Sequence, residues 1–509
     1  MAADVTPAVP AAADPAWLAG LPVCVAGLGI TGQSVVELLS QRGAQVTALD
    51  SRDDEERQQL AATLERDGVT VRLGDEHMGP GASVPPGTAL VVTSPGLRPD
   101  TPLLAAAVTA GVEVVGDVEL AWRLRPVLAD GTRQQWLAIT GTNGKTTTVR
   151  MLAAMLAAAG HRSIAAGNVG TPILEAVTDS EPFEVVAVEL SSFQLYWSST
   201  VTPLAAVVLN IAAHHLDWHD DIDSYIAAKS RIYAPGTIAV FNAEDPRSAA
   251  MAAGAADVAR RVGFRLGRPQ RGELGVADGW LTDRAFGADG GIPGLALAKA
   301  EAVRPAAPHN VADALAAAAL ARAYGDAAEA VAAGLEAFQP EPHRISDVAT
   351  RGGVRFVDDS KASNPAAAMA SLASFPSIVW IAGGLFRGTD EDLDTLVAGA
   401  LPRLRAAVLL GADRARFARA LARHAPDVPV TEVPGTDTGV MDLVVAQAAR
   451  LARAGDTVLL APAAQSFDMF RDYPARGDAF AAAVGRLAVL AAGGTAPPDP
   501  PGASAEASR

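Results

Sequence analysis

Residues 140–146 read Thr140-Gly-Thr-Asn-Gly-Lys-Thr146, and this stretch decides how the middle of the chain folds. It follows an apolar run at 136–139 and precedes an Ala-rich helical pattern at 147–159, so we expect a strand, a loop and a helix in that order. Glycines allow the backbone N–H groups of such a loop to face an anion, and the start of the helix adds partial positive charge. The stretch therefore predicts a phosphate-binding loop.

The same loop carries the side chains that a nucleoside triphosphate requires. Lys145 is placed to contact the β- and γ-phosphates, and the Thr146 hydroxyl is placed to ligate Mg²⁺. Ile139 stands where the common phosphate-loop pattern has its first glycine, which predicts a shorter, specialised loop. The candidate ATP contacts in this stretch are Gly141, Thr142, Asn143, Gly144, Lys145, Thr146 and Thr147.

Polar residues end two further apolar runs. Glu189 follows the run at 185–188, and Asn210 follows the run at 205–209. A carboxylate at the end of a buried strand is costly unless it is paired, and a metal ion beside the phosphate loop would remove that cost. His215 could be a second ligand, although a lone histidine is more often a packed polar residue.

Strand and helix patterns also alternate on both sides of this central part. Near the N-terminus, Gly27-Leu-Gly-Ile-Thr-Gly32 follows a β-type run, and Asp50 follows a second one at 45–49. Strand-like runs near 354–357, 378–381, 406–410 and 457–460 alternate with helical patterns. We therefore predict an α/β protein with a Rossmann-like N-terminal domain at 1–127, a central P-loop ATPase-like domain at 128–342, a C-terminal Rossmann-like domain at 343–492 and a disordered tail at 493–509.

Composition excludes several classes of protein. The formal net charge of −16 argues against broad binding to nucleic acid or anionic membranes. Cys24 is the only cysteine, so it can form neither an intramolecular disulfide nor a cysteine-based metal cluster, and we expect it to be buried. Residues 1–15 do not resemble a signal peptide, and the uncharged stretch at 190–216 is too polar to span a membrane. We expect a cytoplasmic protein that does not insert into membranes.

Taken in order, the motifs of this chain resemble the Mur ligase family, whose enzymes add amino acids to the peptide of cell-wall precursors. Besides the phosphate loop, they are Asn168-Val-Gly170, Glu189-Leu-Ser-Ser-Phe-Gln194, the set Asn210, His215 and Asp217, Ala228-Lys-Ser-Arg-Ile-Tyr233, His309-Asn310, Pro342-His-Arg344 and Asp358-Asp-Ser-Lys-Ala-Ser-Asn364. Four segments make the chain most similar to the D-glutamate-adding branch: Gly27-Leu-Gly-Ile-Thr-Gly32, Gly116-Asp-Val-Glu-Leu120, Ser191-Ser-Phe-Gln-Leu195 and Ala461-Pro-Ala-Ala-Gln-Ser-Phe-Asp468.

The resemblance implies a cytoplasmic, monomeric ligase that joins D-glutamate to UDP-N-acetylmuramoyl-L-alanine through an acyl phosphate, with ATP as co-substrate and two Mg²⁺ ions. It implies catalytic roles for Lys145, Glu189, His215 and Lys229, and metal contacts at Thr146, Glu189, His215 and carbamylated Lys229. It places the UDP-substrate at Ile30, Thr31, Asp50, Ser51, Arg52, Gly96, Asn168 and Gln194. It adds Asn310, Arg344 and Asp359 to the ATP contacts, and it places D-glutamate at Lys361, Ser363, Arg387, Ser466 and Tyr473.

Three residues depart either from a surface reading or from the family pattern, namely Lys229, Arg387 and Ser363. Without its context Lys229 would be read as a solvated surface charge, whereas the resemblance implies that it is carbamylated and approaches Mg²⁺. Arg387 stands near a position where the family often has lysine, and Ser363 stands where relatives often have threonine. A guanidinium can still bind a carboxylate but with different geometry, and serine keeps the hydroxyl, so we expect binding to survive.

Other functions fit parts of the sequence. The glycine pattern at 27–32 with Asp50 also fits a nicotinamide-dependent dehydrogenase, although hydride transfer needs neither the later phosphate loop nor Glu189. Another Mur-type ligase or a folylpolyglutamate-synthase-like ligase would share the central motifs. A nucleotide-regulated binding protein without turnover would keep the loop alone.

Overall fold

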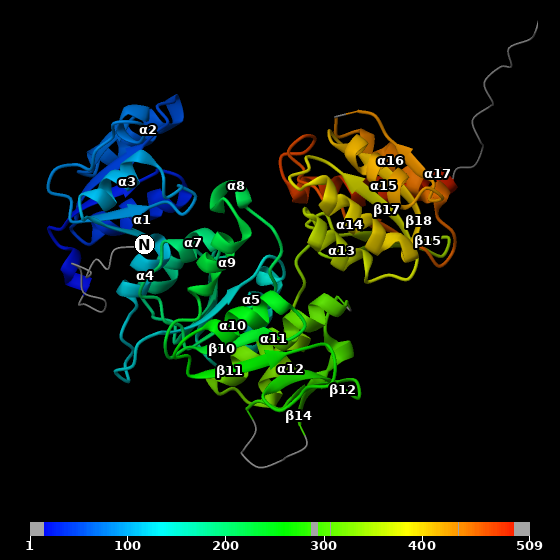
Figure 1. Ribbon diagram of the computed structural model, residues 1–509, viewed down its shortest axis with the longest axis horizontal. Coiled ribbons are helices and arrows are strands. Elements are labelled where there is room, and N and C mark those ends of the chain that lie inside the picture. Colours follow the sequence, from blue (N-terminus) through cyan, green and yellow to red (C-terminus); the bar gives the residue numbers. More distant parts are fainter. Residues whose placement is uncertain (1–14, 287–293, 306, 436, 493–509) are drawn as a thin grey trace, which may run out of the picture. The chain divides into compact units, whose positions relative to one another are not determined.

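The computed structural model describes residues 15–286, 294–305, 307–435 and 437–492, and the tail expected to be disordered lies outside them. The chain divides into two compact units between Gln339 and Pro340. The first unit contains two β-sheets and the second contains one (Figure 1).

The first sheet has five strands, all parallel, in the order β3-β2-β1-β4-β5. Its strands are β1 (Pro22–Ala26), β2 (Gln45–Asp50), β3 (Thr70–Leu73), β4 (Leu90–Thr93) and β5 (Glu113–Gly116). Its helices are α1 (Ile30–Gln41), α2 (Glu55–Arg66), α3 (Pro102–Thr109) and α4 (Asp117–Leu124), with the 3-10 turns Pro15–Leu18 and Asp75–His77. The strand order reverses between β1 and β4, so the loops after these two strands border the crevice where open α/β sheets bind ligands.

The central sheet has nine strands in the order β14-β13-β12-β11-β10-β9-β6-β8-β7, and only β13 runs opposite to the other strands, so that the pairs β12–β13 and β13–β14 are antiparallel. The strands are β6 (Gln135–Thr140), β7 (Ser163–Gly167), β8 (Val185–Glu189), β9 (Ala205–Val208), β10 (Ile238–Asn242), β11 (Arg260–Phe264), β12 (Glu273–Ala277), β13 (Trp280–Asp283) and β14 (Leu295–Lys299). The helices are α5 (Lys145–Ala158), α6 (Ile173–Thr178), α7 (Ser192–Tyr196), α8 (Leu216–His219), α9 (Ile222–Ser230), α10 (Pro246–Gly254), α11 (Pro308–Tyr324) and α12 (Ala328–Ala337), with a 3-10 turn at Ala300–Ala302.

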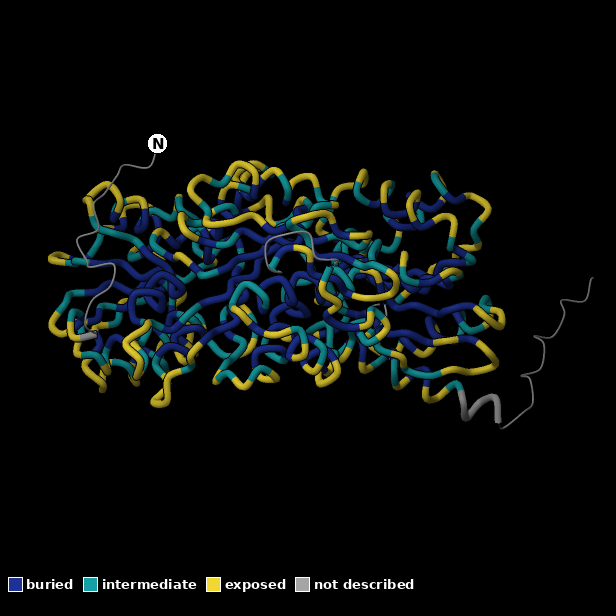
Figure 2. Tube along the Cα trace, turned by 90° about the horizontal axis from the view of Figure 1, so that it is seen from below, coloured by how far each residue is buried: buried dark blue, intermediate teal, exposed yellow. Residues whose placement is uncertain are grey.

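The central strands are apolar on both faces because helices cover both. In β6, Leu137 and Ile139 belong to one core, whereas Trp136 and Ala138 belong to the other. The helices α5, α11 and α12 pack together over the first of these faces, and the small alanines of α11 let it approach the strands closely (Figure 1). In Figure 2 the buried strands form the interior of each unit and exposed loops surround them.

The third sheet has six strands in the order β15-β16-β20-β17-β18-β19, and only β15 is antiparallel. Its strands are β15 (Ser346–Arg351), β16 (Val354–Asp358), β17 (Ile378–Gly383), β18 (Leu404–Leu410), β19 (Val430–Glu432) and β20 (Thr457–Leu460). Its helices are α13 (Pro365–Leu372), α14 (Asp390–Ala400), α15 (Arg414–His424), α16 (Val440–Leu451) and α17 (Tyr473–Ala492), with a 3-10 turn at Leu401–Arg403.

The α/β fold with three parallel-rich sheets confirms the class predicted from sequence. The strand expected at 136–139 is confirmed as β6, while α5 begins at Lys145, two residues earlier than the helical pattern indicated. The strands β12, β13 and β14, which form one side of the central sheet, were not expected from the sequence. Cys24 is buried, as predicted, and burial raises the pKa of its thiol to about 12. Within the described residues, every helix is too short or too polar to cross a membrane.

Candidate functional site

The phosphate-binding stretch forms a tight loop between β6 and α5. Gly144 caps α5 with φ of 84°, and Gly141 has φ of 152°. A Cβ atom at Gly144 would lie 2.3 Å from Asp313 Oδ1, so both backbone conformation and lack of space require glycine there. The Lys145 ammonium donates to the backbone oxygens of Gly141 and Thr142, each over 3.0 Å, so it lies over the loop.

The segment after β9 holds the loop in this shape. Thr142 N–H donates to the Asn210 backbone oxygen over 2.9 Å, and Asn143 N–H donates to Asn210 Oδ1 over 2.9 Å. The hydroxyls of Thr142 and Tyr225 lie 3.0 Å apart within hydrogen-bonding distance. The loop is therefore braced from the neighbouring strand.

Glu189 lies beside the start of α5. β8, which ends at Glu189, pairs with β6, so the carboxylate and the phosphate loop share one edge of the sheet. Glu189 is 1% exposed; its Oε2 accepts from Thr146 Oγ1 over 3.0 Å, and its Oε1 accepts from Asn168 Nδ2 over 3.1 Å. Both hydrogen-bond donors are neutral. A buried carboxylate beside a hydroxyl supplies the oxygen ligands that Mg²⁺ prefers, so Glu189 and Thr146 fit the expected metal.

Lys229 is buried against the same loop, so its reading as a solvated surface charge is wrong. Its Nζ donates to Thr140 Oγ1 over 2.9 Å and to the Gly141 backbone oxygen over 3.0 Å. Burial lowers the pKa of Lys229 well below its usual value, nearby Lys145 lowers it further, and Glu189 opposes the shift. The lowered pKa favours the neutral, nucleophilic form of the Lys229 amine.

His215 precedes α8 and lies in an aromatic cluster. Its backbone is left-handed with φ of 57°, and its ring centroid lies 4.8 Å from that of Phe193 and 3.8 Å from that of His214. Burial, with the nearby cationic side chains, lowers the pKa of His214 to about 3, and burial also lowers the pKa of His215. Neutral imidazole is the form that ligates metals.

The candidate uridine residues divide into an exposed group and a buried group. Ile30 is exposed at the first residue of α1, and Ser51, Arg52 and Gly96 are exposed in the loops that follow β2 and β4. Asp50 is buried, and its carboxylate accepts the N–H groups of Leu28 over 2.6 Å and Arg52 over 2.9 Å. Asp50 thus fixes the glycine loop that follows β1.

The remaining candidates of the first unit differ in burial, and Asn168 is exposed. Gln194 is buried; its amide donates to Asp117 Oδ2 over 3.3 Å and accepts from the Ser191 N–H over 3.0 Å. Thr31 lies half-buried in the first turn of α1. Asn168 belongs with Glu189, as described above, and Asn310 is buried at the start of α11, where its amide donates to the Pro305 backbone oxygen over 3.0 Å.

The candidates of the second unit gather where its parallel strands end. Lys361 follows β16, and its Nζ lies 4.0 Å from the centre of the Tyr473 ring. Burial raises the pKa of Asp359 to about 6. Arg344 Nε donates to Glu341 Oε2 over 2.8 Å. The other candidates of this unit are Ser363, half-buried in the loop before α13, buried Ser466, and Arg387, exposed in the loop after β17.

Arg476 is a structural partner of this group that the sequence analysis missed. It is 1% exposed, and its guanidinium donates to the Ser360 backbone oxygen over 2.7 Å and to the Ala464 backbone oxygen over 3.0 Å. It therefore joins the loops that carry Lys361 and Ser466. An arginine in an Ala-rich helix gives no sequence signal of burial. Tyr225 was also missed, because its partner Thr142 lies 83 residues away in the sequence.

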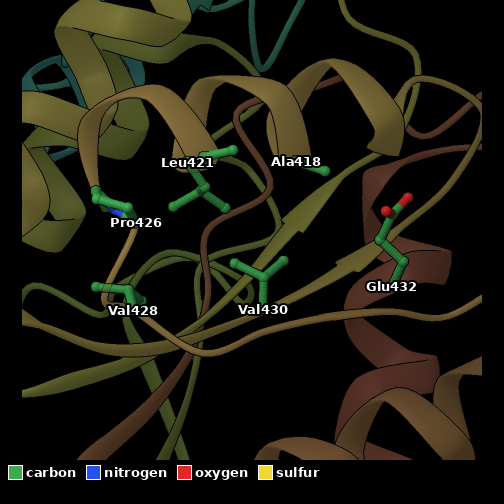
Figure 3. Close-up of a pocket in the computed structure, with 8 residues that line it drawn as sticks. Ala418, Leu421, Pro426, Val428, Val430 and Glu432 are labelled. Carbon is green, nitrogen blue, oxygen red and sulfur yellow. The ribbon is translucent and has the colours of Figure 1, made fainter.

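A separate groove of about 340 Å³ lies between α15 and β19 (Figure 3). It is lined by Ala418, Leu421, Ala422, Ala425, Pro426, Val428, Val430 and Glu432. None of the candidate residues lines it, and Glu432 is its only titratable side chain. The groove therefore offers no chemistry for phosphate transfer.

Comparison with known proteins finds Mur ligase domains along most of the chain. The Mur ligase MurD-like N-terminal domain matches residues 22–116, the Mur ligase middle domain matches 139–321, and the Mur ligase glutamate ligase domain matches 343–464. The UDP-N-acetylmuramoylalanine–D-glutamate ligase of Thermobifida fusca is 56% identical over 92% of this chain and 99% of its own length. The enzyme of the same name from Streptomyces coelicolor is 53% identical over 93% of this chain and 99% of its own length.

The chain belongs to the Mur ligase family. Solved structures agree with the Mur ligase fold. A pseudomurein peptide ligase type C from Methanothermus fervidus has a TM-score of 0.54 at 17% identity and covers 92% of this chain and 100% of its own. MurF from Acinetobacter baumannii has a TM-score of 0.54 at 18% identity and covers 88% of each chain.

Proposed function

We propose that this Mur ligase joins D-glutamate to UDP-N-acetylmuramoyl-L-alanine, with ATP as co-substrate, in peptidoglycan precursor synthesis. The observation that carries the proposal is the shared sheet edge at which Lys145, Thr146 and Glu189 meet, in a chain whose relatives from Thermobifida fusca and Streptomyces coelicolor carry the name of that ligase. In the first step a carboxylate oxygen of the L-alanyl group attacks the γ-phosphorus of ATP, the new P–O bond forms, and ADP leaves. In the second step the D-glutamate amine attacks the acyl carbon, the C–N bond forms, phosphate leaves and the nitrogen loses a proton.

The first step requires charge neutralisation and alignment more than covalent help. The loop amides and the Lys145 ammonium hold the phosphates, and the remaining ATP contacts come from Asn310, Arg344 and Asp359. Two Mg²⁺ ions would supply further positive charge, held by Thr146, Glu189, His215 and carbamylated Lys229. Buried Glu189, whose oxygens accept from the neutral donors Thr146 and Asn168, supports this assignment.

We assign the carbamyl group to Lys229. The neutral amine attacks the carbon of CO₂, the N–C bond forms as one C=O π bond opens, and the nitrogen loses a proton. The product is an anion in place of a cation. The lowered pKa of Lys229, caused first by its burial, supports this step because only the unprotonated amine can react.

The uridine nucleotide is assigned to the exposed loops of the first sheet, with Asn168 and Gln194 completing the set. D-glutamate is assigned to Lys361, Ser363, Arg387, Ser466 and Tyr473 of the second unit. Arg387 is exposed and can present a bidentate fork to a carboxylate. We expect Arg387→Ala to raise the KM for D-glutamate about tenfold or more without a similar change in the KM for ATP.

We further propose a cytoplasmic, monomeric protein with domains at 1–127, 128–342 and 343–492. Each of these ranges contains one of the three sheets, which supports the division. Arg125 and Arg133 flank the first boundary, and the Arg125 side chain donates to the Gln134 backbone oxygen over 3.1 Å.

Product formation tests the function directly. Phosphate release should require both D-glutamate and UDP-N-acetylmuramoyl-L-alanine, and mass spectrometry should find the D-glutamyl product. L-glutamate with a folate acceptor, or another amino acid with a Mur-type acceptor, should give no product. Phosphate release without D-glutamate would contradict the proposal. Release with L-glutamate and a folate acceptor would favour a folylpolyglutamate-synthase-like ligase, and release with another amino acid and a Mur-type acceptor would favour another Mur-type ligase.

A further inference from the structure

The loop that follows β4 in the first sheet contacts the segment that begins with His215. The Trp218 indole Nε1 donates to the Gly96 backbone oxygen over 3.0 Å. The Arg98 guanidinium donates to the Asp217 backbone oxygen, and its Nη2 lies 2.9 Å from Asp220 Oδ1. These contacts connect the loop to α8 at several points along its length.

α8 depends on outside contacts for its position. It has four residues, and left-handed residues other than glycine stand at both ends, His215 with φ of 57° and Asp220 with φ of 68°. This conformation is unfavourable for a residue with a Cβ, and so short a helix has little stability of its own. The contacts that join α8 to Gly96 and Arg98 therefore help to fix the position of His215.

The loop that carries Arg98 is itself tied to the glycine loop of the first sheet. Ser94 Oγ donates to the Gly27 backbone oxygen over 3.1 Å, and the Asp100 carboxylate lies 3.0 Å from Arg98 Nε. A continuous chain of contacts therefore runs from Gly27 through Gly96 and Arg98 to α8.

We propose that Arg98 is a positioning residue that couples the loop at Gly96 to His215. The inference rests on the proposed function, because that function assigns the uridine nucleotide to Gly96 and a metal to His215. Arg98 acts by holding α8 against the loop and contacts no reacting atom. A substrate that orders the loop then strengthens metal binding at His215, and metal binding strengthens substrate binding by the same factor.

Mn²⁺ binding, measured by electron paramagnetic resonance with and without UDP-N-acetylmuramoyl-L-alanine, tests this coupling in the intact protein. We expect the substrate to tighten Mn²⁺ binding to the wild-type protein, and Arg98→Ala to reduce that effect about threefold to tenfold. Arg98→Lys should give an intermediate value, because lysine keeps the positive charge but lacks the fork that reaches two partners.

Arg162→Ala is the matched control. Arg162 also donates to a backbone oxygen, that of Glu181 over 2.7 Å, and lies 3.4 Å from an Asp179 carboxylate oxygen, but no candidate residue is among its partners. This variant should keep the wild-type coupling. If Arg98→Ala does not fold, Asp220→Asn replaces it in the test. Asp220→Asn removes the ion pair between Arg98 and Asp220 by changing the acidic partner, and it should reproduce part of the expected loss of coupling.

Equal coupling in the wild-type and folded Arg98→Ala proteins would overturn the proposal, as would an equal loss in Arg162→Ala. Product formation by the wild-type protein separates this failure from a failure of the proposed function. A wild-type protein that forms the D-glutamyl product while Arg98→Ala keeps full coupling refutes the positioning role alone.

Discussion

Thr146 Oγ1 donates a hydrogen bond to Glu189 Oε2 over 3.0 Å, and this contact joins the first turn of α5 to the end of β8. Residues 43 positions apart meet because β8 lies next to β6 in the sheet. The hydroxyl therefore holds one carboxylate oxygen beside the phosphate loop, where a magnesium–nucleotide complex requires oxygen donors.

Replacement of Thr146 tests this contact. Thr146→Val keeps the side-chain shape but removes the hydroxyl, so we expect the Mg²⁺ concentration for half-maximal phosphate release to rise about tenfold to a hundredfold. Thr146→Ser keeps the hydroxyl and should stay close to wild type. Equal Mg²⁺ requirements for the two variants would show that the hydroxyl has no part in metal binding.

Replacement of Gly144 tests the shape of the loop. Gly144→Ala should raise the KM for ATP about tenfold or more, because the new Cβ would lie 2.3 Å from Asp313 Oδ1. Gly160→Ala is the control, since Gly160 has a similar φ of 88° but no atom within 4 Å of the place that a Cβ would occupy. It should cost about 1 kcal/mol in the free energy of unfolding and leave the KM for ATP unchanged. A KM for ATP at the wild-type value in a folded Gly144→Ala protein would show that the contact with Asp313 does not shape the ATP site.

Lys229→Ala should lower activity about a hundredfold or more, because the variant cannot carry the carbamyl anion. Short carboxylic acids should restore part of the activity by supplying an anion in the space of the missing group. Lys145→Ala is the comparison, since Lys145 acts as a cation and added carboxylates should not rescue it. Failure of carboxylic acids to rescue Lys229→Ala would count against carbamylation.

Asp117→Asn should change how stability depends on pH. Burial raises the pKa of Asp117 from 3.8 to about 6, so as pH rises from 3.8 to about 6 the unfolded chain loses this proton before the folded chain does. The wild-type protein therefore loses stability over that window, on the order of 3 kcal/mol. The asparagine variant has no such proton, and its amide oxygen can still accept from Gln194.

Denaturant unfolding at several pH values measures this difference. Asp117→Asn should be more stable than wild type at pH 7, and the advantage should fade towards pH 4. A stability difference that does not vary with pH would show that the folded and unfolded states bind the Asp117 proton equally.

Local patterns predicted the parts of the site that lie in one short segment. The phosphate loop and Glu189 were found because each follows an apolar strand, and parallel strands bring their carboxyl ends to one edge. Arg476 and Tyr225 depend on partners far away in the chain, which no local pattern reveals. Lys229 shows most clearly how distant packing overrides a local pattern. Its residue type and its sequence neighbours suggest a surface charge, whereas packing against Thr140 and Gly141 buries it.

The most direct test of the central claim is product formation by wild-type, Lys145→Ala and Glu189→Ala proteins, measured by mass spectrometry of UDP-N-acetylmuramoyl-L-alanyl-D-glutamate. Substrates are ATP, D-glutamate and UDP-N-acetylmuramoyl-L-alanine, and circular dichroism shows whether each variant is folded. We predict product from the wild-type protein and a loss of about a hundredfold or more in each folded variant. Product formed at the wild-type rate by either variant would contradict the assignment of phosphate transfer to this edge of the central sheet.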